Sequence, residues 1–522
     1  MRLPALLVLG CCLAAARAEE EVEGEDAQEV TAYAQAGVGN DEDDVAVAGI
    51  WHDNSLIIAA TTTGFLEVDA NFGGIDIVIR SFDSNLEEIA AVQYGGDGDD
   101  EVKAMAGDSE IQLNIVIVGS TTSEEDHLFD LDTATGETDW FIAELDSSTL
   151  EVTNQYVNGT QYENQQATAV GIDLDGEGYY VAGWCWGEYF EENAGSDANT
   201  EDTIGYDWWV LKINKDLDDY EWTAQYGTKA YDEPSAIVVG SAGVFVVGSS
   251  TDNDDILDTD AEENIPAMFV YCLDGDSGET IWVVDDELGF VSDGSQAHGA
   301  VLNEAGTELF VAGTTRGTIP GYDGEATDTD ELFVVAIDTD DGTVNWIWQS
   351  ESNATAFGTA GVVMADDGVS PIVAGTAFGN QFNLTYTYWQ SGSGDMIAAK
   401  INPDDLEVTK YFVAAAASTD TREDAYAIVK DPNEVDGVFL IGQTNGDFID
   451  EEVEPETTSN YLVLQVTLET LPEEEEDEDT GKDYPYWYIG VPLYAVGGIL
   501  FVVAYKWAEA SAAAKLKRAS QV

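Results

Sequence analysis

The apolar residues of the chain fall mainly in short runs, in which apolar and polar positions alternate with a period of two. These runs are rich in β-branched and aromatic residues, and Gly, Asp and Asn cluster between them. Alternation of this kind is typical of strands, and the residues between the runs are strong turn formers. No extended helical periodicity occurs outside residues 486–505. The pattern therefore predicts an all-β domain followed by one helix.

One strand pattern recurs seven times along the chain. Each copy is an apolar run that ends in a small residue, and these residues are Ala60, Gly119, Gly183, Gly248, Gly313, Gly375 and Gly442. Successive copies lie 59 to 67 residues apart. A second apolar run, usually led by an acid, follows each copy and starts at Asp76, Asp139, Asp207, Ala267, Glu331, Asp395 and Asn460.

Two further strands complete each unit. One follows the acid-led run and often carries aromatic residues, such as Trp222, Trp282 and Trp346, and the other precedes the next small-residue run. Four short strands in a repeated unit are the signature of a propeller blade. Seven units favour a closed seven-bladed β-propeller, because closure leaves only short and protected strand edges. A β-solenoid that does not close is the competing architecture.

The sequence also indicates how the ring closes. The seventh unit has no strand of the aromatic class after the run that starts at Asn460. At the other end of the domain, Glu29–Gly37 resembles Leu150–Gly159 and Leu406–Ala414, which fill that position in other units. We therefore expect Glu29–Gly37 to complete the last blade and to pair the two ends of the domain.

These residues carry a family resemblance. The order of an apolar strand, Val-x-Gly-Ser/Thr-Thr and an acid-led strand, with Gln93-Tyr94-Gly95 or Gln225-Tyr226-Gly227 before it, resembles the SBBP-type seven-bladed β-propeller repeat. The resemblance covers nearly all of residues 19–472, and the sequence departs from the repeat at Ala60, Ala267 and Asn460. It implies the fold but no single activity, because these repeats share no common chemistry. The turn-plus-Trp segments, such as Leu273–Trp282, also resemble quinoprotein-type blades, which we interpret as shared blade architecture.

The two ends of the chain predict a type I single-pass membrane protein. Residues 1–18 combine a charged start, a short apolar run and an Ala-x-Ala cleavage site, which is typical of a signal peptide. Residues 486–505 are uncharged, mostly apolar and flanked by aromatic residues, as in a membrane-spanning helix. A helix of this length is long enough to span a bilayer. The acidic linker 473–485 precedes this helix and the basic tail 506–522 follows it, which places the tail in the cytoplasm. The β-propeller ectodomain, 19–472, would then be extracellular or lumenal.

The charge of the chain narrows the choice of partners. Among 522 residues there are 17 Lys and Arg against 104 Asp and Glu, a formal net charge of −87. Nucleic-acid binding requires basic patches and is excluded by this balance. Cationic partners, divalent metals or a high-salt exterior suit such a domain better. With three histidines far apart in sequence, and without a P-loop, a nucleophile elbow or a Rossmann fingerprint, no catalytic residue is predicted.

Calcium is the metal that the acidic turns suit, because it prefers six to eight oxygen ligands. Three turns place acids at alternate positions around a glycine, and their candidate calcium ligands are Asp173, Asp175, Asp274, Asp276, Asp338 and Asp340. None of these turns matches a complete EF-hand loop. The alternative for each is an ordinary acidic β-turn.

Several surface features remain as expectations. Asn158, Asn353 and Asn383 begin N-x-Thr sequons, which would carry glycans in a translocated domain. The C-terminal Ser520-Gln521-Val522 resembles a ligand for a PDZ-type partner. Cys185 and Cys272, the two cysteines of the ectodomain, form either one disulfide or two buried thiols.

Three functions are open at this level. The first is a membrane-anchored recognition, adhesion or scaffold module that binds a protein or glycan on a propeller face, since loops on a rigid scaffold often carry binding sites. The second is an ectodomain enzyme that acts on glycans or polymers, which would need carboxyl groups with strongly perturbed pKa values. The third is an acidic, calcium-binding structural protein of the secretory pathway or cell coat.

Overall fold

The structure is a computed structural model. It describes residues 30–35, 43–64, 73–107, 114–123, 138–159, 164–187, 189, 205–227, 231–251, 266–284, 294–319, 321–322, 329–350, 355–378, 394–414, 422–445 and 460–470. The predicted signal peptide 1–18, linker 473–485, membrane helix 486–505 and tail 506–522 all lie outside these residues. Within the described ranges, no helix is long and apolar enough to cross a membrane.

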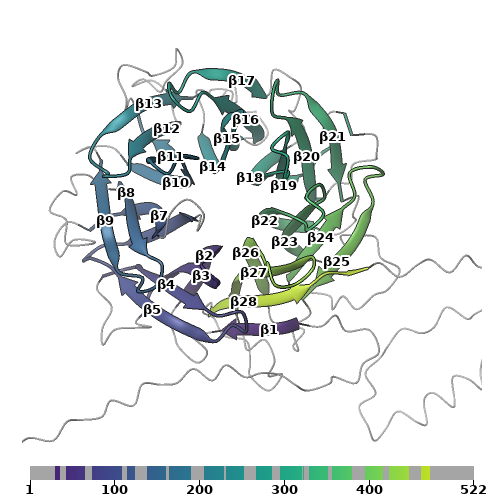
Figure 1. The fold of residues 1–522 in the computed structure, drawn as a ribbon, viewed down its shortest axis with the longest axis horizontal. Coiled ribbons are helices and arrows are strands. Elements are labelled where there is room, and N and C mark those ends of the chain that lie inside the picture. Colours follow the sequence, from purple (N-terminus) through teal and green to yellow (C-terminus); the bar gives the residue numbers. More distant parts are fainter. Residues whose placement is uncertain are drawn as a thin grey trace, which may run out of the picture. The chain divides into compact units, whose positions relative to one another are not determined.

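Seven antiparallel sheets are arranged as blades around a central axis (Figure 1). Blade 1 consists of β2 (Asp44–His52), β3 (Ser55–Thr62), β4 (Asp76–Phe82) and β5 (Glu88–Tyr94). Blade 2 consists of β6 (Asp100–Ala106), β7 (Asn114–Thr121), β8 (Asp139–Asp146) and β9 (Val152–Asn158). Blade 3 consists of β10 (Gln165–Ile172), β11 (Gly178–Cys185), β12 (Asp207–Asn214) and β13 (Tyr220–Tyr226). Blade 4 consists of β14 (Asp232–Gly240), β15 (Gly243–Ser250), β16 (Ala267–Leu273) and β17 (Thr280–Val284).

The remaining blades follow the same order, with additions at the end of the domain. Blade 5 consists of β18 (Ser295–Leu302), β19 (Glu308–Thr315), β20 (Glu331–Asp338) and β21 (Val344–Gln349). Blade 6 consists of β22 (Thr355–Met364), β23 (Pro371–Phe378), β24 (Asp395–Ile401), β25 (Val408–Val413) and β29 (Glu469–Thr470). Blade 7 consists of β26 (Glu423–Lys430), β27 (Gly437–Thr444), β28 (Asn460–Thr467) and β1 (Val30–Gln35).

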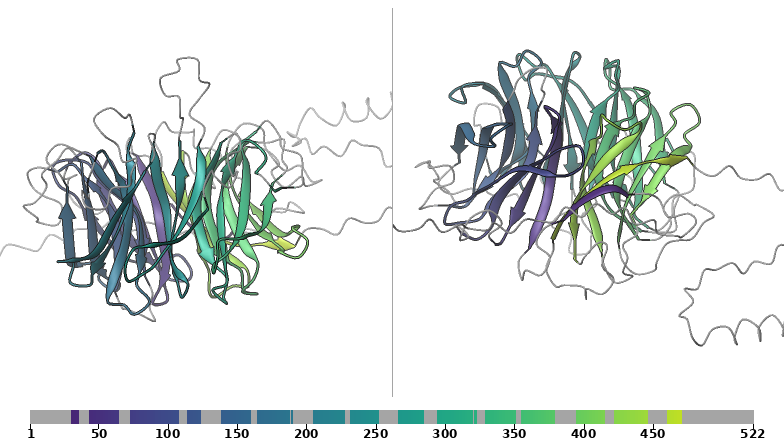
Figure 2. Two further views of the ribbon diagram at one scale, coloured as in Figure 1. Left: turned by 90° about the horizontal axis from the view of Figure 1, so that it is seen from above. Right: turned by 60° about the horizontal axis from the view of Figure 1, so that its bottom comes forward.

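The structure confirms the seven-bladed propeller. The third strand of every blade starts at the residue that the acid-led pattern marked, from Asp76 in blade 1 to Asn460 in blade 7. The first strand of each blade lies nearest the axis and the last strand lies outermost (Figure 1). The inner strands run roughly along the axis, so they are seen along their length when the ring is turned on its side (Figure 2).

Antiparallel order gives the ring two different faces. We call the face with the turns after each first and third strand the hairpin face, and the opposite one the loop face. On the hairpin face these turns are short, for example between β24 and β25, which are joined by residues 402–407. The candidate calcium turns also lie on the hairpin face, in blades 3, 4 and 5.

The core lies between the blades. Strand β4 is buried over its whole length, because both sides of its sheet are covered by neighbouring blades. One apolar cluster joins each pair of adjacent blades, giving seven in all. Burial of one Val, Leu or Ile side chain contributes roughly 1.5–3 kcal/mol, so these clusters hold the ring together without disulfides. Cys185 and Cys272 are both buried and form no disulfide bond, and burial raises the pKa of the Cys272 thiol to about 12.

The ring is closed by the first strand of the domain. β1 pairs antiparallel with β28, with Tyr33 opposite Leu464, which confirms that the segment within Glu29–Gly37 completes the last blade. A cluster containing Ile58 of blade 1 and Tyr461 of blade 7 packs across the same junction. The non-closing solenoid is therefore wrong. The pattern did not predict β29, which pairs with β25 and makes blade 6 five-stranded.

Candidate ligand cleft between two blades

The turns between third and fourth strands share one geometry in blades 2, 4, 5 and 6. In blade 6, the N–H of Asn402 donates to the carbonyl of Glu407 at 3.0 Å, and the N–H of Leu406 donates to the carbonyl of Asn402 at 2.8 Å. The residue before the last turn position has a positive φ in all four blades: Leu150 (61°), Gly278 (71°), Gly342 (75°) and Leu406 (61°). Glycine adopts this left-handed conformation without strain, whereas leucine does not.

In two places, a tryptophan of one blade closes onto the turn of the next. Trp222 of blade 3 donates its indole N–H to the carbonyl of Gly275 in blade 4 at 2.9 Å. A Cβ added at Gly278 would lie 2.5 Å from the Trp222 ring, so only glycine leaves room for it. Trp282 of blade 4 repeats this contact on blade 5. Its indole N–H donates to a turn carbonyl at 3.1 Å, and its ring would lie 2.8 Å from an added Cβ at the positive-φ glycine. We call this contact the tryptophan latch.

The corresponding tryptophan of blade 5 does not latch. Trp346 lies opposite Ala336, in the same strand register as Trp222 opposite Lys212. The turn that it would close on carries Leu406 where the latched turns have glycine, and a Cβ at that position leaves no room for a ring held as in the latch. Within the described part of the chain, the Trp346 indole N–H donates no hydrogen bond to this turn. The ring packs on Phe310, with 5.5 Å between centroids, much as the latched Trp282 packs on Phe245 at 5.8 Å.

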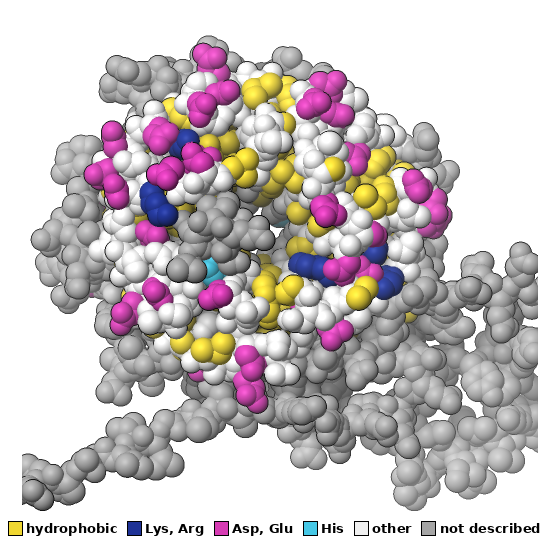
Figure 3. Space-filling view, viewed as in Figure 1, with side chains coloured by type: hydrophobic (Ala, Val, Ile, Leu, Met, Phe, Trp, Pro, Cys, Tyr) yellow, Lys and Arg dark blue, Asp and Glu magenta, His cyan; other side chains and the backbone are white. Residues whose placement is uncertain are grey.

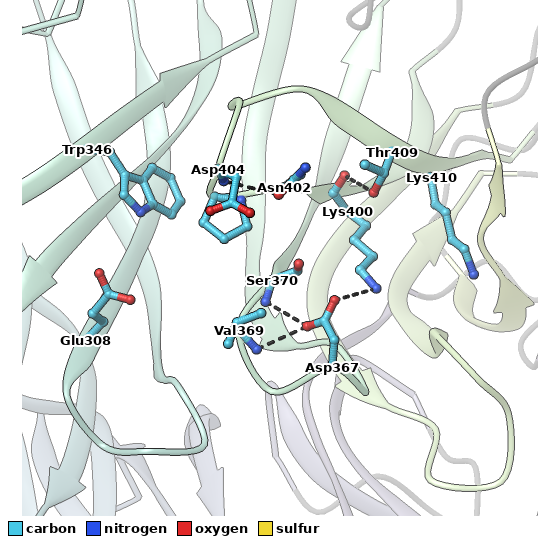
Figure 4. A pocket seen from close by; sticks show the side chains of 11 residues that line it. Glu308, Trp346, Asp367, Val369, Ser370, Lys400, Asn402, Asp404, Thr409 and Lys410 are labelled. Carbon is cyan, nitrogen blue, oxygen red and sulfur yellow. Dashed lines mark hydrogen bonds and ion pairs between the residues drawn. The ribbon is translucent and has the colours of Figure 1, made fainter. Parts of the chain in front are cut away.

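A cleft of about 840 Å³ opens where the latch is missing. Its lining comes from strands and turns of blades 5 and 6: Glu308, Trp346, Asp367, Val369, Ser370, Lys400, Asn402, Pro403, Asp404, Thr409 and Lys410. Figure 4 shows Trp346 and Glu308 on one wall and Asp404 facing them across the cleft. The volume lies within the usual range for ligand pockets of about 300–1,000 Å³.

A compensated charge network forms the far end of the cleft. Lys400 Nζ lies 2.9 Å from Asp367 Oδ2 and 3.1 Å from Asp436 Oδ1, and Lys410 Nζ lies 2.8 Å from Asp436 Oδ2. Burial opposes ionisation of Asp367, but hydrogen bonds from Lys400 and the turn amides lower the pKa of this carboxyl to about 2. Burial likewise opposes ionisation of Asp436, yet Lys410 and Lys400 lower its pKa. Each lysine at this end therefore has a carboxylate partner.

The acids beside Trp346 have no such compensation. Glu308 accepts a hydrogen bond from the Asn345 amide at 2.9 Å, which leaves its charge in place. Asp404 is exposed, and only its backbone N–H is held, by Asn402 Oδ1 at 3.1 Å. In the part of the chain that the structure describes, neither carboxylate has a lysine or arginine partner. In the space-filling view along the axis, lysine and arginine gather in a few places among scattered acids (Figure 3).

The structure places the candidate calcium ligands in separate turns. Asp173 pairs with Lys212, with 2.6 Å between Oδ2 and Nζ, so its charge is already compensated. Asp175 accepts from the Glu177 N–H at 2.9 Å, and Asp338 accepts from the Asp340 N–H at 2.9 Å. In the described ranges, no group of three or more His, Cys, Asp or Glu side chains is arranged to hold a metal.

The third candidate turn has the same internal bonding. Hydrogen bonds from the Ser277 hydroxyl and N–H lower the pKa of Asp274, whose Oδ1 also accepts from the Asp276 N–H at 3.2 Å. Asp175, Asp274 and Asp338 therefore close their own turns, as side chains at such positions commonly do. Calcium binding by the six residues stays a prediction.

The glycan sites differ in what the structure describes. Asn158 ends β9, and its Nδ2, the atom that would carry a glycan, donates to the Tyr220 hydroxyl at 2.7 Å. A glycan at Asn158 would replace this contact. Asn353, Asn383 and the C-terminal Ser520-Gln521-Val522 lie outside the described residues.

Sequence reasoning noted Trp346 as a strand aromatic but did not find the cleft. The available signal was Leu406, which stands where glycine is found in the turns that pack on Trp222 and Trp282. This turn belongs to the blade that follows the Trp346 strand. The meaning of this signal depends on the register that brings residues of two blades together. No single repeat therefore contains the information.

No protein-family profile and no curated protein matches the chain. Among solved structures, the β-propeller domain of the Trilobed protease from Pyrococcus furiosus is 8% identical, with a TM-score of 0.41, over 83% of this chain and 99% of that one. Pyrococcus horikoshii acylaminoacyl peptidase is 10% identical, with a TM-score of 0.43, over 83% of this chain and 52% of that one. This chain thus spans about half the length of that peptidase.

A further similar structure is the quinohemoprotein alcohol dehydrogenase from Comamonas testosteroni, which is 9% identical with a TM-score of 0.40. The alignment covers 84% of this chain and 78% of that one. These likenesses concern the propeller fold, and they carry no argument about activity.

Proposed function

We propose that the protein is a membrane-anchored recognition module of the SBBP-type propeller group, whose ectodomain binds a partner protein through the cleft between blades 5 and 6. The observation that carries this proposal is the missing tryptophan latch, which leaves a cleft with an aromatic wall and charged groups on a rigid ring. The signal-peptide pattern of 1–18 and the apolar run 486–505 support an extracellular or lumenal position. The basic tail 506–522 would then face the cytoplasm.

Binding suits the cleft better than catalysis on glycans. A glycoside hydrolase needs one carboxylic acid that stays protonated near neutral pH, with a raised pKa. The cleft carboxyl with the clearest change is Asp367, and its pKa is lowered to about 2 despite partial burial. Asp367 is therefore held as a carboxylate that positions Lys400, which is a structural role.

Photo-crosslinking from the wall of the cleft tests this proposal. A benzophenone amino acid is placed in the full chain at Val369, which lines the cleft and is 50% exposed, or at Ile281 in blade 4, which is 49% exposed. Intact cells that carry each variant are illuminated with extracellular protein from the source organism, and products are identified by mass spectrometry. We expect a defined partner from Val369 alone, which disappears in Trp346→Ala. The same products from both positions would overturn the proposal.

A further inference from the structure

We propose that the cleft accepts one cationic side chain, a lysine or arginine of a basic partner segment, on the indole face of Trp346 between Glu308 and Asp404. This inference rests on the proposed function and specifies the chemistry of the partner.

The first argument is the state of the tryptophan. The indoles of Trp222 and Trp282 each donate to a turn carbonyl, and glycine turns lie against their rings. Trp346 packs on Phe310 and lines an open cleft. A cation over the face of an indole is attracted by the negative potential of the ring, and the attraction grows when water is excluded. The Trp346 indole thus lines an open cleft and, in the described part of the chain, donates to no turn carbonyl.

The second argument is the balance of charge within the cleft. Lys400 and Lys410 are held by Asp367 and Asp436, and their side chains are only 12% and 27% exposed. An anionic ligand would have to displace these carboxylates. Glu308 and Asp404, by contrast, flank Trp346 without a cationic partner in the described part of the chain, so the charge that a ligand must complement there is negative (Figure 4).

The third argument is the character of the walls and of the whole molecule. Val369 and Pro403 line the cleft and provide apolar surface for the methylene stem of a lysine or arginine side chain. The net charge of −87 attracts cations toward the domain from a distance. Long-range attraction alone gives no specificity, which the indole and the two carboxylates supply at short range.

The test uses labelled peptides and the purified full chain. The probe is a fluorescent Gly-Ser hexapeptide with one central arginine, compared with the same peptide containing citrulline, which keeps the shape but not the charge. Anisotropy is measured at 150 mM and 500 mM NaCl with EDTA present. We expect binding of the arginine peptide only, with affinity reduced about tenfold by Trp346→Ala, as the loss of a partly desolvated cation–π contact requires.

Charge variants keep the test decisive if Trp346→Ala fails to fold. Asp404→Asn should weaken binding by a similar factor, whereas Asp340→Asn should not, because Asp340 holds the corresponding position in the latched turn of blade 5. Equal losses from Asp404→Asn and Asp340→Asn would mean unspecific attraction and would overturn the inference. If Val369 still crosslinks a partner while the citrulline peptide binds as well as arginine, the proposed function stands and the cationic ligand is wrong.

Discussion

At the residue scale, a hydrogen bond to a buried acid explains why a glutamine recurs near the end of the outer strand, as in Gln-Tyr-Gly. In blades 1, 3 and 5 a glutamine of the outer strand donates to the first acid of the third strand: Gln93 to Asp76 at 2.7 Å, Gln225 to Asp207 at 2.9 Å and Gln349 to Glu331 at 2.5 Å. Each glutamine also donates to a glycine carbonyl in the loop that precedes the third strand. The amide thus ties two strands and a loop together inside each blade.

Blade 6 lacks this amide, and its acid shows the consequence. Val413 lies opposite Ile397, at the position that glutamine holds in blades 1, 3 and 5, and Asp395 is 7% exposed. Burial raises the pKa of Asp395 to about 7. Because this value lies above the unfolded value of about 3.9, the stabilising contribution of Asp395 is full below about pH 4 and is lost as the pH rises toward 7.

We therefore predict that Val413→Gln stabilises the protein in a pH-dependent way. The new amide would hydrogen-bond the ionised Asp395 and lower its pKa, adding about 1 kcal/mol at pH 7.5 and little at pH 4. The thermal midpoint measured at both pH values checks this. In an Asp395→Asn background the effect of Val413→Gln should become equal at the two pH values. An equal effect in the wild-type background would show that Asp395 is not the group that titrates.

At the scale of the element, closure depends on one short strand. β1 contributes the outer strand of blade 7 and pairs over Val30 to Gln35 with β28. Without it, β28 would present unpaired backbone groups at an exposed edge. The cluster between blades 7 and 1 would also lose the contact of Ala34.

Deletion of residues 19–37 should therefore open the ring. We expect a thermal midpoint lower by several degrees and a tendency to associate through the exposed edge of β28, measured by calorimetry and light scattering. A matched deletion of residues 19–28, which leaves β1 intact, should behave as the wild type. If the longer deletion melts like the shorter one, β1 does not close the ring.

The repeat made this element predictable, and its limits explain what was missed. The alternation of apolar and polar residues located the third strand of each blade. The missing fourth strand of the seventh unit pointed to the segment that contains β1. β29 has only two residues, too few to show a period. The cleft arises from Trp346 and Leu406, which lie in different repeats. Only the packing of blade 5 on blade 6 shows that Leu406 prevents Trp346 from forming the latch. The acidic turns carried a calcium pattern, yet Asp173 has Lys212 as its partner, which lies 39 residues away in sequence.

At the scale of the whole molecule, charge works against the compact ring. A formal net charge of −87 means that folding brings many carboxylates together, which opposes the compact state by mutual repulsion. Exposed charges are screened over about 8 Å at physiological salt and about 3 Å at 1 M. Much of this repulsion should therefore disappear as salt is added, while the buried pairs, such as Lys212 with Asp173, are screened less.

We predict that the thermal midpoint of the protein rises by several degrees between 0.1 M and 1 M NaCl. A comparison of calcium with magnesium then distinguishes screening of the acidic surface from binding of calcium. At fixed ionic strength, a cation that binds only the folded state at about 100 times its Kd adds about 2.7 kcal/mol to the free energy of unfolding. A rise in the midpoint with millimolar calcium but not magnesium, reduced by Asp274→Asn with Asp276→Asn, would establish calcium sites in the acidic turns. Equal responses to both cations would mean that these aspartates only close their turns, and that the acidic surface responds to ionic strength alone.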